Sequence, residues 1–564
     1  MLSAAISPDG KYLAYADGTG IHLKLIATGE ERDIPQPAEL ANNGSQWSVE
    51  GWFPDGTRFL ANSMQKMWGP TWGPAPTTAW LVSVLGARPR KFRDDARVWS
   101  VSPDGSQIAF TARRGNIAGQ EVWVMRTDGE QPRRIFAATE GSEISTVRWS
   151  PDGQRLAYQK LNQAPADREV SIETRDLRGG SPVAILSSRA LISPFFDSLL
   201  GYCWLPNGRV LYSLYEPPPN QKNSNLWEIM VDGRTGKATG DPRKITQWTG
   251  FLIASLSATV DGKRIAFARQ SHQTVTLLSE LEPNHRLGNS RPLTSGETDW
   301  VWDWAPDSGA VLFNSYRNGS WDIFRQALDQ TSAEPVIVGP RDELFPRLSP
   351  DGKWLLYAIL PKDVYPPTPP STPIQLMRVP VSGGPPQPIL EARGYFVHSC
   401  STHPGGPCVV AERTPDRKEL IFTTFDPLKG RGPKVATLET DTHRDWYGWN
   451  LSPDGSRLAV LPGREPNNDL RIFSVPGGAA RDLIVEGWRG FTAVNWLADG
   501  RGMIISAQSA QGTTLVCVDL EGNAHALMEQ RASPDSYAVA SRDGRHLAIS
   551  ADAINSNIWT MEDF

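Results

Sequence analysis

The sequence predicts an all-β protein of twelve four-stranded blades, closed into two tandem six-bladed β-propellers. Three observations support this fold class: a four-residue turn motif recurs along the whole chain, an apolar strand follows nearly every copy, and the composition favours strands over helices. The chain has 50 Gly, 46 Pro and 21 Trp, which suits many short strands joined by tight turns. A period of roughly 40 to 55 residues is typical of propellers.

The recurring turn has the sequence Ser-Pro-Asp-Gly. Intact copies begin at Ser7, Ser102, Ser150, Ser349 and Ser452. Altered copies begin at Phe53, Leu205, Thr259, Ala305, Leu497 and Ser541, and a degenerate copy occupies 401–406. Proline pre-sets φ, aspartate caps the turn and glycine accepts the positive φ that reverses the chain. Twelve repeats result.

Each repeat predicts four strands. The first often carries Trp just before the turn, as at Trp149, and the second is a short apolar run such as 12–15. The third has the pattern aliphatic, aromatic, any residue, aliphatic, as in 122–125. The fourth ends in a basic and then an aliphatic residue, as in 244–246. Such short runs indicate buried strands. Four strands per repeat make one propeller blade.

The domain organisation follows from the number of blades. A chain of 564 residues exceeds what one hydrophobic core organises, and propellers close with about four to eight blades. We therefore expect one propeller over 1–295 and another over 296–564, with seven plus five blades as the alternative. The first repeat begins at residue 1 and the last stops after its third strand, so we expect a strand from elsewhere, from a longer parent protein, to complete that blade.

A family resemblance rests on these motifs. The tetrad, the following aliphatic-Ala-aromatic strand and the Arg-x-Leu-Thr ending resemble the TolB-type propeller repeat, a relative of the WD repeat. Residues 6–15, 23–30 and 557–564 also resemble the C-terminal propeller region of bacterial membrane-anchored serine/threonine kinases and winged-helix regulators. The resemblance implies a sensor role for the propeller, with the signalling chemistry in a separate N-terminal domain. We expect no kinase or DNA-binding activity from this chain.

Charge and composition narrow the possible partners. The net charge is -5, from 57 basic and 62 acidic residues spread along the chain, so neither nucleic acid nor an anionic membrane is an expected partner. The sequence contains no run of 18 apolar residues, so we do not expect direct insertion into a membrane. We expect a periplasmic or extracytoplasmic location if the parent protein is membrane-anchored, and otherwise a cytoplasmic one.

The predicted function is a non-catalytic sensor or protein-interaction scaffold without a cofactor. The alternative is an enzyme-associated propeller, which gates a hydrolase or acts as a lyase in its channel. A gated hydrolase needs a Gly-x-Ser-x-Gly segment, which the sequence does not contain. We expect a protein or small-molecule ligand on the face that bears the long loops.

Candidate binding residues lie in loops. The long insertions between second and third strands cover 64–78, 160–170, 216–224 and 361–373. Trp68 and Trp72 lie in a Gly/Pro-rich insertion without a repeat equivalent, where partner contact and loop anchoring are equally plausible. The charged residues expected at the entrances to first strands are Glu143, Asp299, Glu343, Arg444, Asp445 and Arg489. They could ring the channel mouths, although ordinary solvated charge is the alternative.

Three further patterns have a structural explanation that we favour. His443-Arg444-Asp445 with Asn450 has the spacing of a kinase catalytic loop, but the phosphate and metal clamps of a kinase are missing, so we interpret it as coincidence. The segment 398–408 contains His398, Cys400, His403 and Cys408, which suggests zinc, a pair of thiols or a Cys400–Cys408 disulfide. We favour paired cysteines, and no metal is predicted.

The third pattern is the aromatic cluster Trp300, Trp302 and Trp304. A sugar-stacking platform is one interpretation. Their alternate spacing continues the packing between blades, and we favour that second interpretation.

Overall fold

The structure is a computed structural model, and it describes most of the chain. The described residues are 3–17, 19–37, 40, 46–64, 77–114, 117–139, 141–162, 169–191, 201–217, 220, 223–294, 298–360, 373–393, 396–440, 446–463, 467–477, 479–509, 512–531 and 536–564. They form 45 strands and one short 3-10 turn, Arg189–Leu191. None of the helical structure in this part of the chain is long and apolar enough to cross a membrane. The protein is all-β, as predicted.

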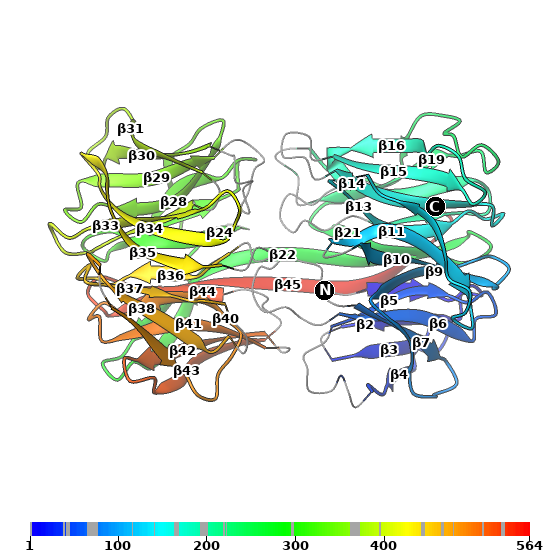
Figure 1. The fold of residues 1–564 in the computed structure, drawn as a ribbon, viewed down its shortest axis with the longest axis horizontal. Helices are drawn as coiled ribbons and strands as arrows, with labels where there is room; N and C mark the ends of the chain where they lie inside the picture. Colours follow the sequence, from blue (N-terminus) through cyan, green and yellow to red (C-terminus); the bar gives the residue numbers. More distant parts are fainter. Residues whose placement is uncertain are drawn as a thin grey trace. The chain divides into compact units, whose positions relative to one another are not determined.

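The strands belong to two compact units, coloured along the sequence in Figure 1. Unit 1 contains the described residues of 3–64, 77–271 and 555–564, and unit 2 contains those of 272–554. Each unit has six blades, numbered here 1–6 in unit 1 and 7–12 in unit 2.

Blades 1–5 of unit 1 are four-stranded antiparallel sheets in which neighbouring strands follow sequence order. Their strands are β1 (Ser3–Ile6), β2 (Tyr12–Ala16), β3 (Ile21–Leu25) and β4 (Glu31–Ile34); β5 (Gln46–Trp52), β6 (Arg58–Met64), β7 (Thr77–Ser83) and β8 (Arg90–Asp94); β9 (Ala96–Val101), β10 (Gln107–Arg114), β11 (Ile117–Arg126) and β12 (Arg133–Ala137); β13 (Ser142–Trp149), β14 (Arg155–Asn162), β15 (Glu169–Asp176) and β16 (Val183–Ser188); β17 (Tyr202–Trp204), β18 (Arg209–Tyr215), β19 (Ser224–Met230) and β20 (Arg243–Lys244).

Blades 7–11 of unit 2 repeat the same arrangement. Their strands are β24 (Asp299–Trp304), β25 (Ala310–Ser315), β26 (Asp322–Ala327) and β27 (Glu334–Ile337); β28 (Asp342–Leu348), β29 (Trp354–Leu360), β30 (Pro373–Pro380) and β31 (Gln387–Arg393); β32 (Phe396–Cys400), β33 (Cys408–Arg413), β34 (Glu419–Asp426) and β35 (Gly430–Glu439); β36 (Trp449–Leu451), β37 (Arg457–Val460), β38 (Asp469–Ser474) and β39 (Ala480–Ile484); β40 (Phe491–Trp496), β41 (Gly502–Ser509), β42 (Gly512–Asp519) and β43 (Ala524–Arg531).

Blades 6 and 12 share one sheet in the order β21-β22-β45-β44, with β23 paired to β22. Its strands are β21 (Leu252–Ala258), β22 (Arg264–Leu281), β23 (Leu287–Pro292), β44 (Ser536–Ala540) and β45 (His546–Glu562). The long strands β22 and β45, labelled in Figure 1, each contribute residues to both units. Blade 6 takes its third strand from the C-terminal part of β45, and blade 12 takes its third and fourth strands from β22 and β23.

This exchange divides the chain differently from the expected segments 1–295 and 296–564. Residues 272–294 belong to unit 2, and 555–564 belong to unit 1. The physical reason is that a 17- or 18-residue strand is long enough to pair within two blades in succession. The expected strand from elsewhere is therefore supplied within the chain for blade 12.

Both units close as six-bladed rings. In unit 1 the first strands of successive blades lie side by side, and β21 returns to contact β1, where the Ile6 N–H donates to Ser257 Oγ at 3.0 Å. In unit 2 the same succession ends with β44 against β24. Six plus six blades is confirmed, and the seven-plus-five alternative is wrong.

The tetrad turns show why the repeat is so regular. In the first one, the Ser7 hydroxyl donates to Asp9 Oδ1 at 2.8 Å and accepts the Tyr12 N–H at 2.9 Å. The Gly10 N–H donates to the Ser7 carbonyl at 2.9 Å, and Gly10 has φ +71°. Because a Cβ is strained at such a φ, glycine is favoured there. The turn chemistry predicted from the sequence is confirmed.

Tryptophans before the turns join neighbouring blades. The Nε1 of Trp52 donates to Ala5 O at 3.0 Å, and that of Trp496 donates to Asn450 O at 3.1 Å. Trp304 is fully buried and donates to Val539 O at 2.9 Å. The prediction that Trp304 serves packing between blades is confirmed.

Candidate functional site

The candidate site is a pocket at one end of the first strands of unit 2, next to the tetrad turns. All six blades contribute the residue two positions before the tetrad. These residues are Asp303, Arg347, Ser399, Asn450, Asn495 and Val539. Their strands are the six first strands of one ring, so six distant segments converge on one space. A pocket with several convergent polar groups is the usual form of a ligand site.

Two guanidinium groups and one carboxylate supply the charge of the pocket. Arg347 and Arg542 line it, and their Nε atoms are buried without a hydrogen-bond partner among the described residues. Asp303 Oδ2 lies 3.5 Å from a terminal nitrogen of Arg542 and accepts the Leu348 N–H at 2.7 Å. One positive charge is therefore left in excess among the lining residues.

Burial acts on Arg347. It lowers the pKa of Arg347, although the nearby charge of Asp303 opposes the shift and that of Arg542 adds to it. The Arg347 guanidinium also lies 5.6 Å from the centre of the Trp302 ring. An anion would offset the cost of keeping these two cations together in a partly dehydrated space.

β-bulges turn two of these side chains toward the pocket. The register of β24 against β25 shifts between Val301 and Asp303, and that of β28 against β29 shifts between Leu344 and Arg347. Phe345, inside the second bulge, has φ +60°. Bulges insert an extra residue and re-aim the side chains that follow.

Neutral polar groups complete the wall. Asn450 Nδ2 donates to Asn495 Oδ1 at 3.0 Å, so the two amides hold each other across neighbouring blades. Cys400 also lines the pocket and forms a disulfide with Cys408 on the paired strand β33. We expected paired thiols or a disulfide rather than a zinc site, and the structure contains the disulfide.

His398 is fully buried on β32. Burial and the charge of Arg347 lower the pKa of His398 to about 3. It is therefore a neutral imidazole at ordinary pH, and it adds no charge near the pocket.

Comparisons with known proteins find similarity among solved structures. No protein-family model matches the chain, and no curated protein matches it. Among solved structures, the tricorn protease aligns at 10% identity and a TM-score of 0.34 over 99% of this chain and 62% of that chain. A putative TolB from Agrobacterium tumefaciens aligns at 16% identity and a TM-score of 0.21 over 66% of this chain and 88% of that chain.

The propeller domain of the Trilobed protease from Pyrococcus furiosus is a further similar structure. It aligns at 12% identity and a TM-score of 0.27 over 61% of this chain and 97% of that chain. The chain spans about 62% of the tricorn protease chain.

Two of the predicted rim residues lie at the opposite ends of the same strands. Asp299 begins β24 and Glu343 is the second residue of β28. Asp299 is fully buried and pairs with Arg317 at 3.1 Å. Glu343 is only 5% exposed, and burial, with the charges of Asp322 and Asp342, raises the pKa of Glu343 to about 7. Neither is an ordinary solvated charge.

The other predicted binding residues are dispersed. Glu143 is half-buried on β13 of unit 1, and Arg489 is exposed just before β40 of unit 2. Trp68, Trp72 and Asp445 lie outside the described residues, as do Arg444 and the rest of the kinase-like triplet at 443–445. Their binding roles remain predictions.

Sequence reasoning missed the residues of the pocket. The signal was available, because all six lie at one fixed position before the tetrad. The same position in unit 1 holds Ala5, Gly51, Ser100, Arg148, Cys203 and Ser257. That set has one charged residue, whereas the unit 2 set has two charges of opposite sign and two amides. Comparing this position between repeats would have pointed to unit 2.

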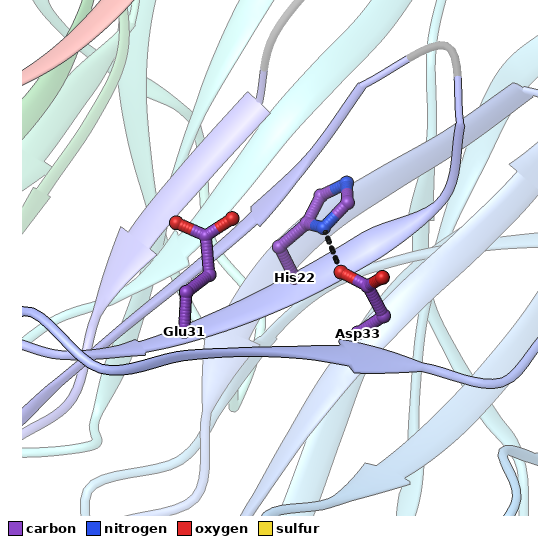
Figure 2. A group of neighbouring side chains, drawn as sticks. All are labelled: His22, Glu31 and Asp33. Carbon is purple, nitrogen blue, oxygen red and sulfur yellow. Dashed lines mark hydrogen bonds and ion pairs between the residues drawn. The ribbon is translucent and has the colours of Figure 1, made fainter.

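A separate cluster on blade 1 has the composition of a metal site. Figure 2 shows His22 with Asp33 and Glu31, whose potential ligand atoms lie within 4.8 Å of one another. His22 Nδ1 lies 2.7 Å from Asp33, and Nε2 lies 3.0 Å from Asp17. Because both ring nitrogens face carboxylates, the geometry favours a protonated imidazole held by ion pairs over a metal ligand.

Proposed function

We propose that this chain is a non-catalytic binding protein whose unit 2 pocket holds a small anionic ligand. The observation that carries the proposal is the pairing of Arg347 and Arg542 against the single carboxylate of Asp303. Guanidinium groups bind carboxylate and phosphate oxygens through two parallel hydrogen bonds. The Asn450 and Asn495 amides offer further hydrogen bonds, which would orient the ligand.

The test is a binding titration of the full chain at low salt. Inorganic phosphate and succinate are the anionic probes, glycerol is the neutral one, and isothermal titration calorimetry is the measurement. We expect Arg347→Gln and Arg542→Gln to weaken anion binding at least ten-fold. The matched control is Arg545→Gln, because Arg545 is exposed on the same turn as Arg542. Equal affinities for all three variants, or no anion binding, would contradict the proposal.

The wider role is that of a sensor or interaction scaffold, belonging to a bacterial signalling protein of the kinase or transcriptional-regulator type. The support is the resemblance of 6–15, 23–30 and 557–564 to such propellers. The Cys400–Cys408 disulfide supports an extracytoplasmic location, since disulfides persist in oxidising compartments. Partners would be a protein or small molecule, bound at this pocket or at loops that include Trp68 and Trp72.

One observation favours a second candidate function, catalysis in the channel of unit 2. Glu343 is buried, its Oε2 has no hydrogen-bond partner among the described residues, and the pKa of Glu343 is about 7. A carboxyl group with such a pKa is suited to general acid–base chemistry. A screen of glycan and peptide substrates with the full chain and Glu343→Gln tests this candidate. Turnover that the variant abolishes would favour the enzyme.

A further inference from the structure

Blade 6 of unit 1 has an open edge. The other five blades of this unit have a fourth strand beside the third. In blade 6 the third position is filled by residues 555–562 of β45, and the described residues of unit 1 place no strand beyond them. An edge strand presents unpaired N–H and C=O groups to which another extended chain can pair.

Side-chain exposure agrees with a missing neighbour. Most side chains from 555 to 562 are exposed, whereas β3, the third strand of blade 1, has none exposed. Trp559 is 43% exposed, although the equivalent Trp80 of blade 2 is 2% exposed. Trp559 lies against Arg269, whose guanidinium carbon is 4.7 Å from the ring centre, so the ring is held while much of it faces solvent.

The other blades show what sits opposite such a tryptophan. Three third strands of unit 1 carry Trp at this position, and each one faces a basic residue on the fourth strand. The pairs are Trp80 with Lys91, Trp123 with Arg134 and Trp227 with Lys244. Lys244 Nζ lies 5.9 Å from the Trp227 ring centre, which is within the range of a cation–π attraction.

The three fourth strands share a sequence as well as a position. Each reads Pro-Arg, then Lys or Arg, then Phe or Ile. The segments are 89–92, 132–135 and 242–245. The final apolar residue packs on a core cluster: Phe92, Ile135 and Ile245 are each partly buried in this way. The basic residue thus stands opposite the tryptophan in all three blades, and in blade 5 it lies over the ring. The apolar residue extends the core.

The core next to blade 6 lacks such a contribution. The cluster shared by blades 1 and 6 has four buried members, Ala4, Ile6, Leu13 and Ala266, with Ile558 packed against it. By contrast, the cluster shared by blades 1 and 2 has 13 buried members. One more apolar side chain at the edge of β45 would enlarge this small core.

We propose that the open edge of blade 6 binds an extended segment of a partner protein with the pattern Pro-Arg-(Lys/Arg)-(Ile/Phe). The segment adds a fourth strand to β45, its second basic residue lies over Trp559, and its apolar residue packs beside Ile558. Backbone pairing supplies affinity, and Trp559 supplies selectivity for a cation at one position. This inference does not rest on the proposed anion pocket, which lies in unit 2.

The test uses the full chain and a capped peptide with the sequence of residues 241–247, Asp-Pro-Arg-Lys-Ile-Thr-Gln. The control peptide has Glu in place of Lys. We expect the first peptide to bind, the Glu peptide to bind at least ten-fold more weakly, and saturation to slow amide hydrogen exchange in 555–562 at least ten-fold. Trp559→Ala should weaken binding at least ten-fold, and Trp559→Phe should weaken it less.

Several results would overturn the proposal. Amides of 555–562 that exchange as slowly as those of β19 in the absence of peptide would show that the edge is already paired. Equal affinity of the two peptides, or of the wild type and Trp559→Ala, would remove the role of Trp559. A concentration-dependent dimer that Trp559→Ala abolishes, without peptide binding, would assign the edge to a second copy of the chain.

Discussion

The Nε1–H of Trp304 donates to the carbonyl oxygen of Val539 at 2.9 Å, which joins the first strand of blade 7 to that of blade 12. The two residues are far apart in sequence, and both are buried. Their hydrogen bond therefore joins the first and the last blade of unit 2 where its ring closes.

Trp304→Phe should destabilise unit 2 by about 1–3 kcal/mol, because it leaves the Val539 carbonyl buried and unpaired. Differential scanning calorimetry of the full chain measures the effect. Trp300→Phe is the matched control, since Trp300 is less buried and packs on the same cluster. An equal loss in both variants would mean that ring volume, and not the hydrogen bond, matters.

His22 should make stability depend on pH. Burial lowers the pKa of His22, but the hydrogen bonds to Asp17 and Asp33 raise it overall. A raised pKa means that the stabilisation is fully present below the unfolded value of about 6.5 and is lost as pH rises through the folded value.

The comparison is His22→Gln with wild type at pH 5.5 and pH 9. We expect a loss of about 1 kcal/mol at the lower pH, because the partner Asp33 is 84% exposed and solvent screens the pair. At pH 9 the variant should be close to wild type. The measurement is chemical denaturation, and a difference that is independent of pH would contradict the ion pairs.

Glu343 should also make the stability of the protein depend on pH. Its folded pKa is about 7, above the unfolded value, so the folded state holds its proton more tightly. Stability is then highest below about pH 4.3 and is lost as pH rises toward 7. Glu343→Gln should remove this loss and be more stable than wild type at pH 8, by at most about 3 kcal/mol. Thermal unfolding of the wild type and of Glu343→Gln at pH 4 and pH 8 tests this prediction. An equal difference in melting temperature at both pH values would contradict it.

The Cys400–Cys408 disulfide leads to a prediction of how many thiols per chain can react. Under denaturing conditions without reductant, two thiols per chain should react, those of Cys203 and Cys517. Replacing both Cys400 and Cys408 by Ser should cost about 2–3 kcal/mol, from the entropy of the loop that the bond closes. Four reactive thiols in the oxidised protein would contradict the pairing.

The sequence by itself determined the number of blades, the turn chemistry and the strand patterns. These features are local, because Ser7, Asp9 and Gly10 act within one turn. The residues of each repeat therefore determine its own turn. Even Cys400 and Cys408 pair across adjacent strands. Repetition then made the signal strong enough to count twelve units.

Only the tertiary structure decided where the units divide and where chemistry gathers. Nothing local shows that β45 crosses from blade 12 to blade 6, because that depends on strand pairing over hundreds of residues. Two β-bulges re-aim Asp303 and Arg347, and the closure of the ring brings Arg542 beside them. The raised pKa of Glu343 reflects burial and the charge of Asp322 from another blade, besides that of the adjacent Asp342. Burial and the approach of Asp322 are properties of packing and not of sequence order.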